Sequence, residues 1–504
     1  MDAQTILELL ENSDDNAVAL SAPGRTDLTF GAISAQIFKS GKLLSSLNVG
    51  RNDRVAIVLP NGPEMASAFV SVGAWATTAP LNPNYKADEY EFYLSDLNAK
   101  LLIVREGVDS PSREVAAKLG LQVVELTVAD GAAAGEFDLK GVEMASLPPT
   151  PATKDDIALV LHTSGTTSRP KIVPLTQTNV AASAKHIRET LSLSPTDKCM
   201  SMMPLFHIHG LIAAVLSSLG AGASIYCAPG FNALKVFEWL KDSEPTWYTA
   251  VPTMHQTLLA RASRNKEVVE STKLRFIRSS SASLPPAVME ELEATFGCPV
   301  IESYGMTEAA HQMASNQLPP GLRKSGFVGA AAGPKVSIMD SDGNLVEQGG
   351  LGEVVISGPN VTLGYENNPK ANEENFTNDW FRTGDQGFLD EDGFLKITGR
   401  LKEIINRGGE KISPLEVDDT LMDHPAVQQV VTFAKPHKML GEDVAAVIVL
   451  KEGMEATDRE IKDFASERLA GFKVPATILF MDEIPKGATG KLQRIGLAEK
   501  LGIA

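Results

Sequence analysis

Short apolar runs alternate with amphipathic stretches in the N-terminal part of the chain. The runs RVAIVL (Arg54–Leu59), KLLIV (Lys100–Val104) and LQVVEL (Leu121–Leu126) have the length of buried strands. Between them, apolar residues recur at helical spacing in EMASAFVSVGAWAT and in SREVAAKLG. This alternation of strands and helices predicts an α/β fold with layered, largely parallel sheets.

A longer apolar segment runs from Leu211 to Pro229 without a charged residue. Its length is close to the roughly 20 residues that a membrane-spanning helix needs. Two serines, followed by Gly220 and Gly222, interrupt it near its middle. We therefore predict a buried helix, a turn and a buried strand (ASIYCA) here rather than a membrane span.

The pattern changes near Gly399, where the segment GRLKEIINRGGEKISP is cationic and contains glycines. Beyond it, Glu416–Leu421 and Arg459–Leu469 have helical spacing, whereas Val427–Phe433 and Val444–Leu450 are strand-like. The sequence thus predicts two domains, a large one over residues 1–399 and a small α+β one over residues 400–504.

The composition narrows the class of function. The 504 residues are 43% hydrophobic and 22% charged, which is typical of a globular protein with more than one domain. With 46 Lys and Arg against 63 Asp and Glu, the formal net charge is −17, which argues against nucleic acid as the main partner. A local group of cations can still bind a small anion, because salt screens charges beyond roughly 8–10 Å.

Cysteine usage and the ends of the chain favour a cytoplasmic setting. The three cysteines, Cys199, Cys227 and Cys298, include no CxxC pair and predict no disulfide framework. The acidic N-terminal sequence MDAQTILELLENSDD lacks the cationic start of a signal peptide, and the final LGIA is not an SKL-type address. We see no obvious interface stripe, so we expect a monomer or a weak dimer.

The stretch LHTSGTTSRPK, Leu161–Lys171, carries the first chemical signal. It combines five hydroxyl residues, a glycine and two cations. Backbone N–H groups and hydroxyls of such a loop can cradle phosphate oxygens, but a solvated turn has the same composition. The spacing GxxxxGK[ST] is absent, so a kinase-like or GTPase-like P-loop is not expected.

Six motifs in order favour the phosphate interpretation. They are TSGTTSRPK (163–171), PLFHIHG (204–210), YGMTE (304–308), FRTGDQG (381–387), GRLKEIINRGGEKISP (399–414) and PKGATGK (485–491). Together they resemble the adenylate-forming superfamily of acyl-CoA synthetases, luciferases and peptide-synthetase adenylation domains. The resemblance implies a large N-terminal domain with a small, mobile C-terminal domain. Ser168 and Ile172 depart from the family pattern, in which glycine is usual, and this leaves the detailed loop conformation open.

The reaction implied by this resemblance has two steps. A carboxylate attacks the α-phosphate of ATP to give acyl-AMP and pyrophosphate, and the thiol of CoA then displaces AMP. The resemblance assigns the nucleotide to Thr163, Ser164, Gly165, Thr166, Thr167, Lys171, Ser281, Ala282, Ser283, Glu302, Ser303, Tyr304, Gly305, Met306, Thr307, Asp385 and Arg400. Within this set, Lys171 and the hydroxyls hold the β- and γ-phosphates, Thr307 the α-phosphate, Tyr304 the adenine, and Asp385 with Arg400 the ribose. Glu308 is expected to ligate Mg²⁺ through a hard oxygen.

The small domain carries the residues that the resemblance associates with movement. Lys491 enters the site for adenylation and bridges the carboxylate and the α-phosphate. Lys402 occupies the hinge position, and rotation there brings Gly408 and Gly409 to the pantetheine arm of CoA. With Thr307 and His207, Lys491 completes the expected catalytic set.

The carboxylate pocket is expected to be polar. His207 resembles the family histidine near the acyl carboxylate, while Ser281 and His311 stand where many relatives have apolar residues or glycine. Burying these groups against an alkyl chain would leave polar atoms unpaired at about 1–3 kcal/mol each. A second carboxylate would satisfy them, and the local sequences resemble oxalate–CoA ligases of plants and fungi. We therefore expect oxalate.

Three alternatives remain open from the sequence. The acid could be malonate, acetate or an aromatic acid such as 4-coumarate. The chain could load a carrier-protein thiol instead of CoA. It could also bind an adenylate without catalysis, although the presence of both Lys491 and Glu308 argues against this.

Overall fold

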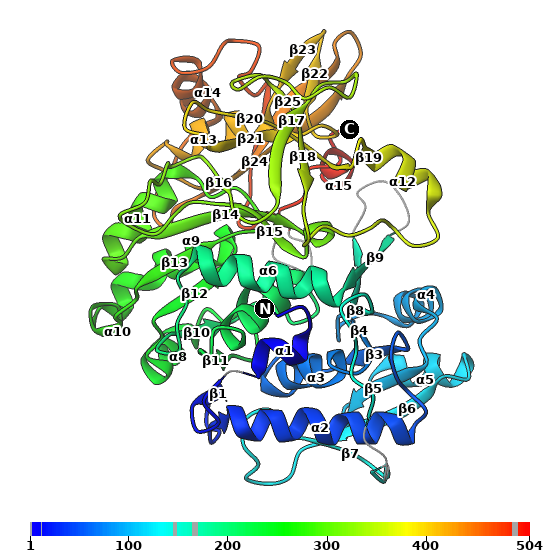
Figure 1. Cartoon of the computed structure of the whole chain (residues 1–504). Coiled ribbons are helices and arrows are strands. Elements are labelled where there is room, and N and C mark those ends of the chain that lie inside the picture. Colours follow the sequence, from blue (N-terminus) through cyan, green and yellow to red (C-terminus); the bar gives the residue numbers. More distant parts are fainter. Residues whose placement is uncertain (1–2, 12, 145–148, 164–169, 486–491) are drawn as a thin grey trace.

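A computed structural model of the chain describes residues 3–11, 13–144, 149–163, 170–485 and 492–504 (Figure 1). Within these residues the strands form two large, mainly parallel sheets, a smaller antiparallel sheet and a mixed C-terminal sheet. None of the helices described there is long and apolar enough to cross a bilayer. The α/β class predicted from the sequence is confirmed.

The first large sheet has seven strands among the described residues, in the order β7-β6-β5-β3-β4-β8-β9. Its strands are β3 Arg54–Val58, β4 Thr77–Pro80, β5 Leu101–Arg105, β6 Gln122–Thr127, β7 Asp138–Leu139, β8 Ile157–Thr163 and β9 Lys171–Thr176. The three apolar runs of the N-terminal part are β3, β5 and β6, and they pair in parallel. Only β7 and β9, at the two edges, pair antiparallel with their neighbours.

The second large sheet contains nine of the described strands, in the order β16-β15-β14-β13-β12-β10-β11-β1-β2. They are β1 Val18–Ser21, β2 Leu28–Thr29, β10 Lys198–Ser201, β11 Ser224–Cys227, β12 Trp247–Ala250, β13 Phe276–Ser279, β14 Val300–Met306, β15 His311–Ser315 and β16 Ala330–Ala331. The central strands from β1 to β14 are parallel, and β15 and β16 extend the sheet antiparallel.

Helices cover the large sheets and join them through one core. They are α1 Ile6–Leu10, α2 Phe30–Ser46, α3 Pro63–Gly73, α4 Ala87–Leu97, α5 Pro111–Lys118, α6 Gln177–Thr190, α7 Ser217–Leu219, α8 Val236–Ser243, α9 Pro252–Ala262, α10 Lys266–Ser271, α11 Pro286–Phe296 and α12 Pro369–Asn375. A capping box starts α6: the Thr176 side chain accepts from Asn179 N, and the Asn179 side chain accepts from Thr176 N. This helix contacts β8 and β9 of one sheet and β15 of the other.

The apolar segment after residue 210 is interior structure. It contains a π-helix, η1 (His209–Leu216), then α7, a turn and β11. Every residue of η1, α7 and β11 is buried. The prediction of a buried helix, a turn and a buried strand is therefore confirmed, although the π-helical geometry could not be seen in the sequence.

An antiparallel sheet follows, which the sequence did not lead us to expect. Its strands are β17 Lys335–Met339, β18 Gly352–Ser357, β19 Phe376–Thr377, β20 Trp380–Leu389 and β21 Leu395–Arg400. After Arg400 the chain leaves this sheet and enters another with β22 at Ile405. The change of sheet lies close to the boundary predicted at Gly399–Lys402.

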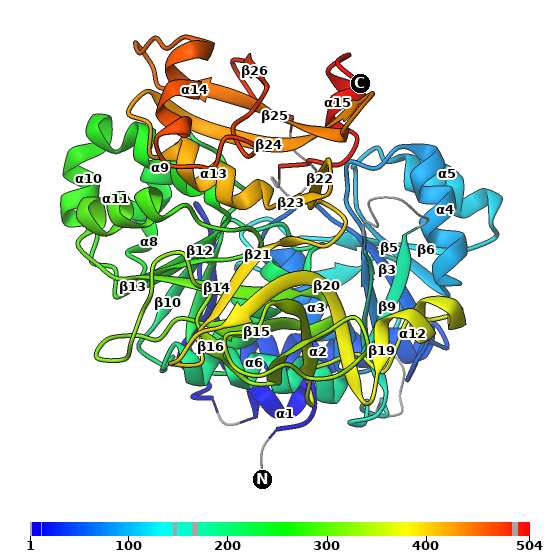
Figure 2. The same cartoon turned by 90° about the horizontal axis from the view of Figure 1, so that it is seen from above.

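The C-terminal unit lies above the two large sheets in Figure 1 and is seen from above in Figure 2. It contains β22 Ile405–Arg407, β23 Glu410–Ile412, β24 Val427–His437, β25 Gly441–Leu450 and β26 Thr477–Phe480, with α13 Pro414–Met422, α14 Asp458–Ser466 and α15 Leu497–Lys500. The helices and strands expected here are all present. The molecule is thus a large N-terminal domain with a small α+β C-terminal domain.

Candidate functional site

Two adjacent parallel strands supply much of the candidate site. β13 leads into Ser281–Ser283, and β14 leads into the short 3₁₀ helix η3, Thr307–Ala309. Because parallel neighbours end at the same edge of a sheet, the segments that follow them lie close together. The side chain of Ser280 donates to Ser303 O at 2.9 Å, which ties the two segments to each other.

The start and the end of the hydroxyl-rich loop are fixed by a strand pair. Thr163 ends β8, Lys171 begins β9, and these two residues are direct partners in the antiparallel register. Ser164, Gly165, Thr166 and Thr167 lie outside the described residues, so their assignment to phosphate stays a prediction. The pairing shows that the chain leaves and re-enters the sheet at one point.

Lys171 and Glu308 are joined through Tyr365. Lys171 Nζ lies 4.3 Å from the centroid of the Tyr365 ring, and the Tyr365 hydroxyl donates to Glu308 Oε1 at 2.7 Å. Glu308 is only 5% exposed. Burial raises the pKa of its carboxyl group, while the hydrogen bond from Tyr365 and the charge of Lys171 oppose that rise. Burial also lowers the pKa of the Lys171 ammonium group. Lys171 and Glu308 therefore lie close together in a poorly solvated part of the candidate site.

The predicted ribose residues also come together. Asp385 of β20 and Arg400 at the end of β21 are partners in the antiparallel register, and Arg400 Nε lies 3.2 Å from Asp385 Oδ1. Tyr304 donates its hydroxyl to the Asp385 carboxylate. Burial, together with the Asp385 charge, raises the pKa of Tyr304, so the phenol remains a neutral donor. One carboxylate is thus held by a cation and a phenol beside the YGMTE segment.

Glu302, another of the residues predicted to bind the nucleotide, has its side chain buried against the protein itself. Its side chain is 2% exposed, and Oε1 accepts from Leu284 N at 2.9 Å. Burial raises the pKa of this carboxyl group to about 8. Through this bond to Leu284, Glu302 holds the end of the segment Ser281, Ala282 and Ser283. Of these three residues, Ala282 is exposed and the two serines are half-buried.

Two backbone segments of the site approach each other closely at Gly305 and His311. A Cβ at Gly305 would lie 2.0 Å from His311 O, so only glycine fits where β14 meets β15. Three neighbouring non-glycine residues have positive φ angles: Ser281 (76°), Ala310 (46°) and His311 (101°). Strained backbone of this kind concentrates at functional sites, where the surrounding structure holds it.

Polar side chains gather in the predicted carboxylate pocket. His209 Nδ1 lies 3.0 Å from Ser281 Oγ, and His209 Nε2 lies 2.6 Å from Thr249 Oγ1. The His209 and His311 rings are 5.0 Å apart between centroids. His209 and Thr249 are fully buried, and His311 is 1% exposed. We call His209, Thr249, Ser281 and His311 the polar cluster.

His207, the histidine predicted for the pocket, is half-buried, and its Nδ1 accepts from His209 N at 3.3 Å. The second histidine of PLFHIHG, His209, contacts Ser281. His207 as the histidine beside the reacting carboxylate stays a prediction, whereas His209 is an addition from the structure.

The predicted hinge and CoA residues lie at the surface. Lys402 follows β21 and is exposed, and Gly408 and Gly409 form the exposed turn between β22 and β23 with φ angles of 62° and 100°. Lys491 lies outside the described residues. Arg494, three residues further along the chain, lies 3.4 Å from Glu403 and 2.6 Å from Asp418 through different nitrogens. Arg494 therefore lies beside Glu403, the residue that follows the predicted hinge.

Sequence reasoning missed His209 and Tyr365. His209 was visible within the motif PLFHIHG, but only the geometry of η1 shows that its side chain reaches Ser281. Tyr365 lies in a segment with no other signal, yet Asn372 fixes its backbone through two hydrogen bonds. The segment also reaches both sides of the site, because Glu366 N donates to Ile172 O and Thr362 N donates to Glu308 O.

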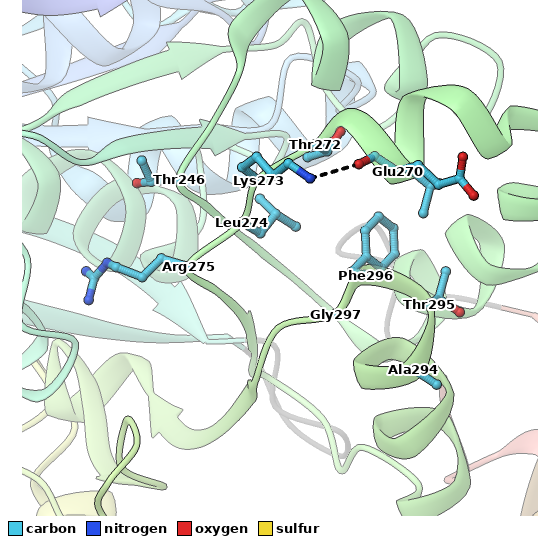
Figure 3. A pocket seen from close by; sticks show the side chains of 11 residues that line it. Thr246, Glu270, Thr272, Lys273, Leu274, Arg275, Ala294, Thr295, Phe296 and Gly297 are labelled. Atoms are coloured by element: carbon cyan, nitrogen blue, oxygen red, sulfur yellow. Dashed lines mark hydrogen bonds between the residues drawn. The ribbon is translucent and has the colours of Figure 1, made fainter.

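A separate surface pocket lies at the other end of the same strands (Figure 3). Its lining includes Thr246 and Arg275, which precede β12 and β13, together with Lys273 and Phe296. Within it, Lys273 Nζ donates to Glu270 O at 3.1 Å. None of the candidate residues lines this pocket, and we assign it no role.

Comparisons with known proteins show the family of the chain. A sequence model of the AMP-binding enzyme family matches residues 10–366, and one of the AMP-binding enzyme C-terminal domain matches residues 416–491. The chain is 45% identical to an oxalate–CoA ligase of Arabidopsis thaliana, covering 98% of both proteins. It is 42% identical to an oxalate–CoA ligase of Saccharomyces cerevisiae, covering 96% of this chain and 94% of the yeast protein. The crystal structure of ATP-bound MatB from Rhodopseudomonas palustris superposes with a TM-score of 0.89 at 28% identity, covering 99% of both chains.

Proposed function

Because this chain belongs to the AMP-binding enzyme family and is an AMP-forming acid–thiol ligase, we propose that the acid it joins to CoA is oxalate. The overall reaction converts oxalate, ATP and CoA into oxalyl-CoA, AMP and pyrophosphate. The observation that carries the proposal is the polar cluster. Its side chains are polar and close together, and all but the half-buried Ser281 are buried, which suits a very small acid with oxygen atoms at both ends.

The first step joins two anions. A carboxylate oxygen of oxalate attacks the α-phosphorus of ATP, the bond to the β-phosphate oxygen breaks, and pyrophosphate leaves. Thr307 and Lys491 are proposed to hold the α-phosphate oxygens as charge develops on them. Asp385, held by Arg400 and Tyr304, is proposed to accept the ribose hydroxyls and so to fix the nucleotide in line for attack.

The second step transfers the acyl group. The CoA sulfur attacks the carbonyl carbon of oxalyl-AMP, the bond from that carbon to the bridging oxygen breaks, and AMP leaves with the oxygen. We propose that rotation at Lys402 removes Lys491 after adenylation and brings Gly408 and Gly409 to the pantetheine arm. Glycines with positive φ in an exposed turn allow a thin chain to pass close to the backbone.

The buried carboxylate of Glu308 fits a magnesium ion bound together with ATP. Glu308 accepts from Tyr365 and is otherwise poorly solvated, so a cation would offset its charge. In the described residues no group of three His, Cys, Asp or Glu side chains could hold a metal alone, and Mg²⁺ in ATP sites uses one or two carboxylates with phosphate oxygens. When bound, Mg²⁺ would neutralise charge on the phosphates.

The polar cluster argues against a fatty or aromatic acid. An alkyl chain or an aromatic ring placed against these imidazole and hydroxyl groups would exclude water from them and offer no hydrogen bond in return, which costs about 1–3 kcal/mol for each group left without a partner.

The identity of the acid is tested by pyrophosphate exchange into ATP over a panel of acids. We expect oxalate to give the highest kcat/KM, and malonate, acetate, 4-coumarate and a long-chain fatty acid to be at least about 10-fold poorer. Exchange with an aromatic or long-chain acid and none with oxalate would overturn the assignment. Formation of the adenylate without transfer to free CoA would favour a carrier protein as the acceptor.

A substitution at Asp385 tests the nucleotide geometry. Asp385→Asn keeps the shape of the side chain but removes its charge, and charge-assisted hydrogen bonds contribute about 1.5–3 kcal/mol. We expect the KM for ATP to rise about 10- to 100-fold, with a much smaller change in the KM for oxalate. Initial rates with each substrate varied in turn provide the measurement, and an unchanged KM for ATP would contradict the role.

Two properties of the whole protein complete the proposal. The three cysteines are free and buried, which is compatible with a reducing compartment such as the cytoplasm. We also propose that the protein acts as a monomer or a weak dimer.

A further inference from the structure

Arg278 is a buried cation whose bonding is incomplete. It is the third residue of β13, its side chain is fully buried, and Nη2 donates to Gln312 Oε1 at 3.3 Å. Nε and Nη1 have no hydrogen-bond partner among the described residues. Buried guanidinium groups are normally paired with carboxylates, because burying an uncompensated charge is strongly unfavourable.

Arg278 lies against the polar cluster. In the parallel register of β12 and β13, Arg278 is the direct partner of Thr249, so the two side chains leave the sheet on the same face. Thr249 Oγ1 is the atom that lies 2.6 Å from His209 Nε2. The guanidinium itself contacts Gln312 of β15, the residue after His311, while the Arg278 backbone lies next to Thr249 of the polar cluster.

The orientation of Gln312 is fixed. Its Nε2 donates to Thr190 Oγ1 and to Ala332 O, each at 3.0 Å. The amide oxygen is consequently the atom that faces Arg278, and it offers a dipole but no negative charge. Within the described part of the chain, no carboxylate forms an ion pair with Arg278.

The Cys199 thiol does not balance the charge either. Burial raises the pKa of the Cys199 thiol well above its usual value, so the sulfur is neutral near pH 7. Burial lowers the pKa of Arg278 to about 9, which still leaves the guanidinium charged at neutral pH. Among the described residues, Arg278 thus has no counter-ion.

We propose that Arg278 is a specificity-determining residue, whose positive charge beside the polar cluster makes the pocket select acids that carry a second negative charge. This inference rests on the proposed function and deepens it, because one carboxylate of the substrate is consumed in adenylation and only the second can remain paired with Arg278. Acids of the same size with a single charge leave the guanidinium uncompensated and are disfavoured.

Oxalate and glyoxylate provide the comparison. They have nearly the same size, but glyoxylate carries an aldehyde in place of the second carboxylate. In pyrophosphate exchange, Arg278→Met is expected to lower kcat/KM for oxalate by at least about 30-fold, since truncating one partner of a buried charge pair typically removes that much affinity. The kcat/KM for glyoxylate is expected to change by less than about 3-fold. Arg278→Lys keeps the charge and is expected to retain most of the preference for oxalate.

Thermal unfolding separates specificity from structure. Removing a buried charge that lacks a counter-ion does not weaken a protein as the loss of an ion pair does, so Arg278→Met is expected to have a Tm equal to or above that of the wild type. Arg275, just before the same strand, is the matched control, because it pairs with the buried Asp197 at 3.0 Å. Arg275→Met is expected to lower Tm and to leave the oxalate-to-glyoxylate ratio unchanged.

Each outcome decides between the claims. If the wild-type enzyme uses oxalate but Arg278→Met loses oxalate and glyoxylate equally, or loses neither, the role of Arg278 is refuted while the proposed function stands. If the wild-type enzyme prefers glyoxylate or another monoanion to oxalate, both fail together. Should Arg278→Met not fold, Arg278→Gln against Arg278→Lys tests the charge with polar side chains in both variants.

Discussion

Lys491→Ala is expected to abolish adenylation and to spare thioester formation. In the first step an anion attacks a phosphate that is itself anionic, so a cation bridging the two stabilises the transition state far more than the separated reactants. Losing one such positioned group typically lowers the rate by about 10²–10³-fold. Pyrophosphate exchange measures the first step, and the release of AMP from a supplied acyl-adenylate on addition of CoA measures the second.

Lys486→Ala is the matched control for Lys491. Both lysines belong to PKGATGK, so both removals change the charge of this segment by one. We expect Lys486→Ala to keep exchange within about 3-fold of the wild type, because the family resemblance assigns the first step to Lys491 and not to Lys486. An equal loss of both half-reactions in Lys491→Ala would mean that the residue supports the fold of the small domain rather than the first step.

Glu308→Gln is expected to produce the second large loss. Glutamine has the shape of glutamate and can still accept the hydrogen bond from Tyr365, but it offers a metal no charge. We expect adenylation to fall by about 10²-fold or more and the concentration of Mg²⁺ needed for half-maximal rate to rise. The stabilisation of the protein by Mg²⁺ and ATP in thermal unfolding is expected to shrink in parallel.

Tyr365→Phe separates the effect of the Glu308 charge from the effect of the hydrogen bond that orients the Glu308 carboxylate. This variant keeps the carboxylate and the ring beneath Lys171 and removes only the hydroxyl. We expect a loss clearly smaller than that of Glu308→Gln. If Glu308→Gln retained the Mg²⁺ dependence of the wild type, Glu308 would not be the metal ligand, whatever the effect of Tyr365→Phe.

The parallel part of the fold was predictable because its strands are short apolar runs. The runs that form β3 and β5 are almost entirely buried, as is the segment that forms η1 and β11, whereas β6 is buried only at Val124 and Leu126. The antiparallel sheet of β17–β21 was not predicted, because its strands are half-exposed and mix polar with apolar residues. Such strands acquire their order from their partners in the sheet rather than from their own pattern.

In the candidate site, too, some residues could be predicted from local sequence motifs and others only from the tertiary structure. Motifs identified Glu308, Asp385 and Arg400, and in the structure Asp385 pairs with Arg400 while Glu308 accepts a hydrogen bond from Tyr365. His209 was not predicted, because only the π-helix shows that its side chain points toward Ser281. Arg278 carried no signal at all, since only strand register reveals that it lies beside Thr249. Residues that act through register and burial cannot be read from spacing alone.

Oxygen-18 in the carboxylates of oxalate gives the most direct test of the central claim, that a carboxylate oxygen attacks the α-phosphate of ATP. The enzyme would be supplied with labelled oxalate, unlabelled ATP and CoA, and the nucleotide and phosphate products analysed by mass spectrometry. The account predicts one labelled oxygen in each AMP formed and none in pyrophosphate. Label in inorganic phosphate, with ADP as the nucleotide product, or AMP without label, would contradict it.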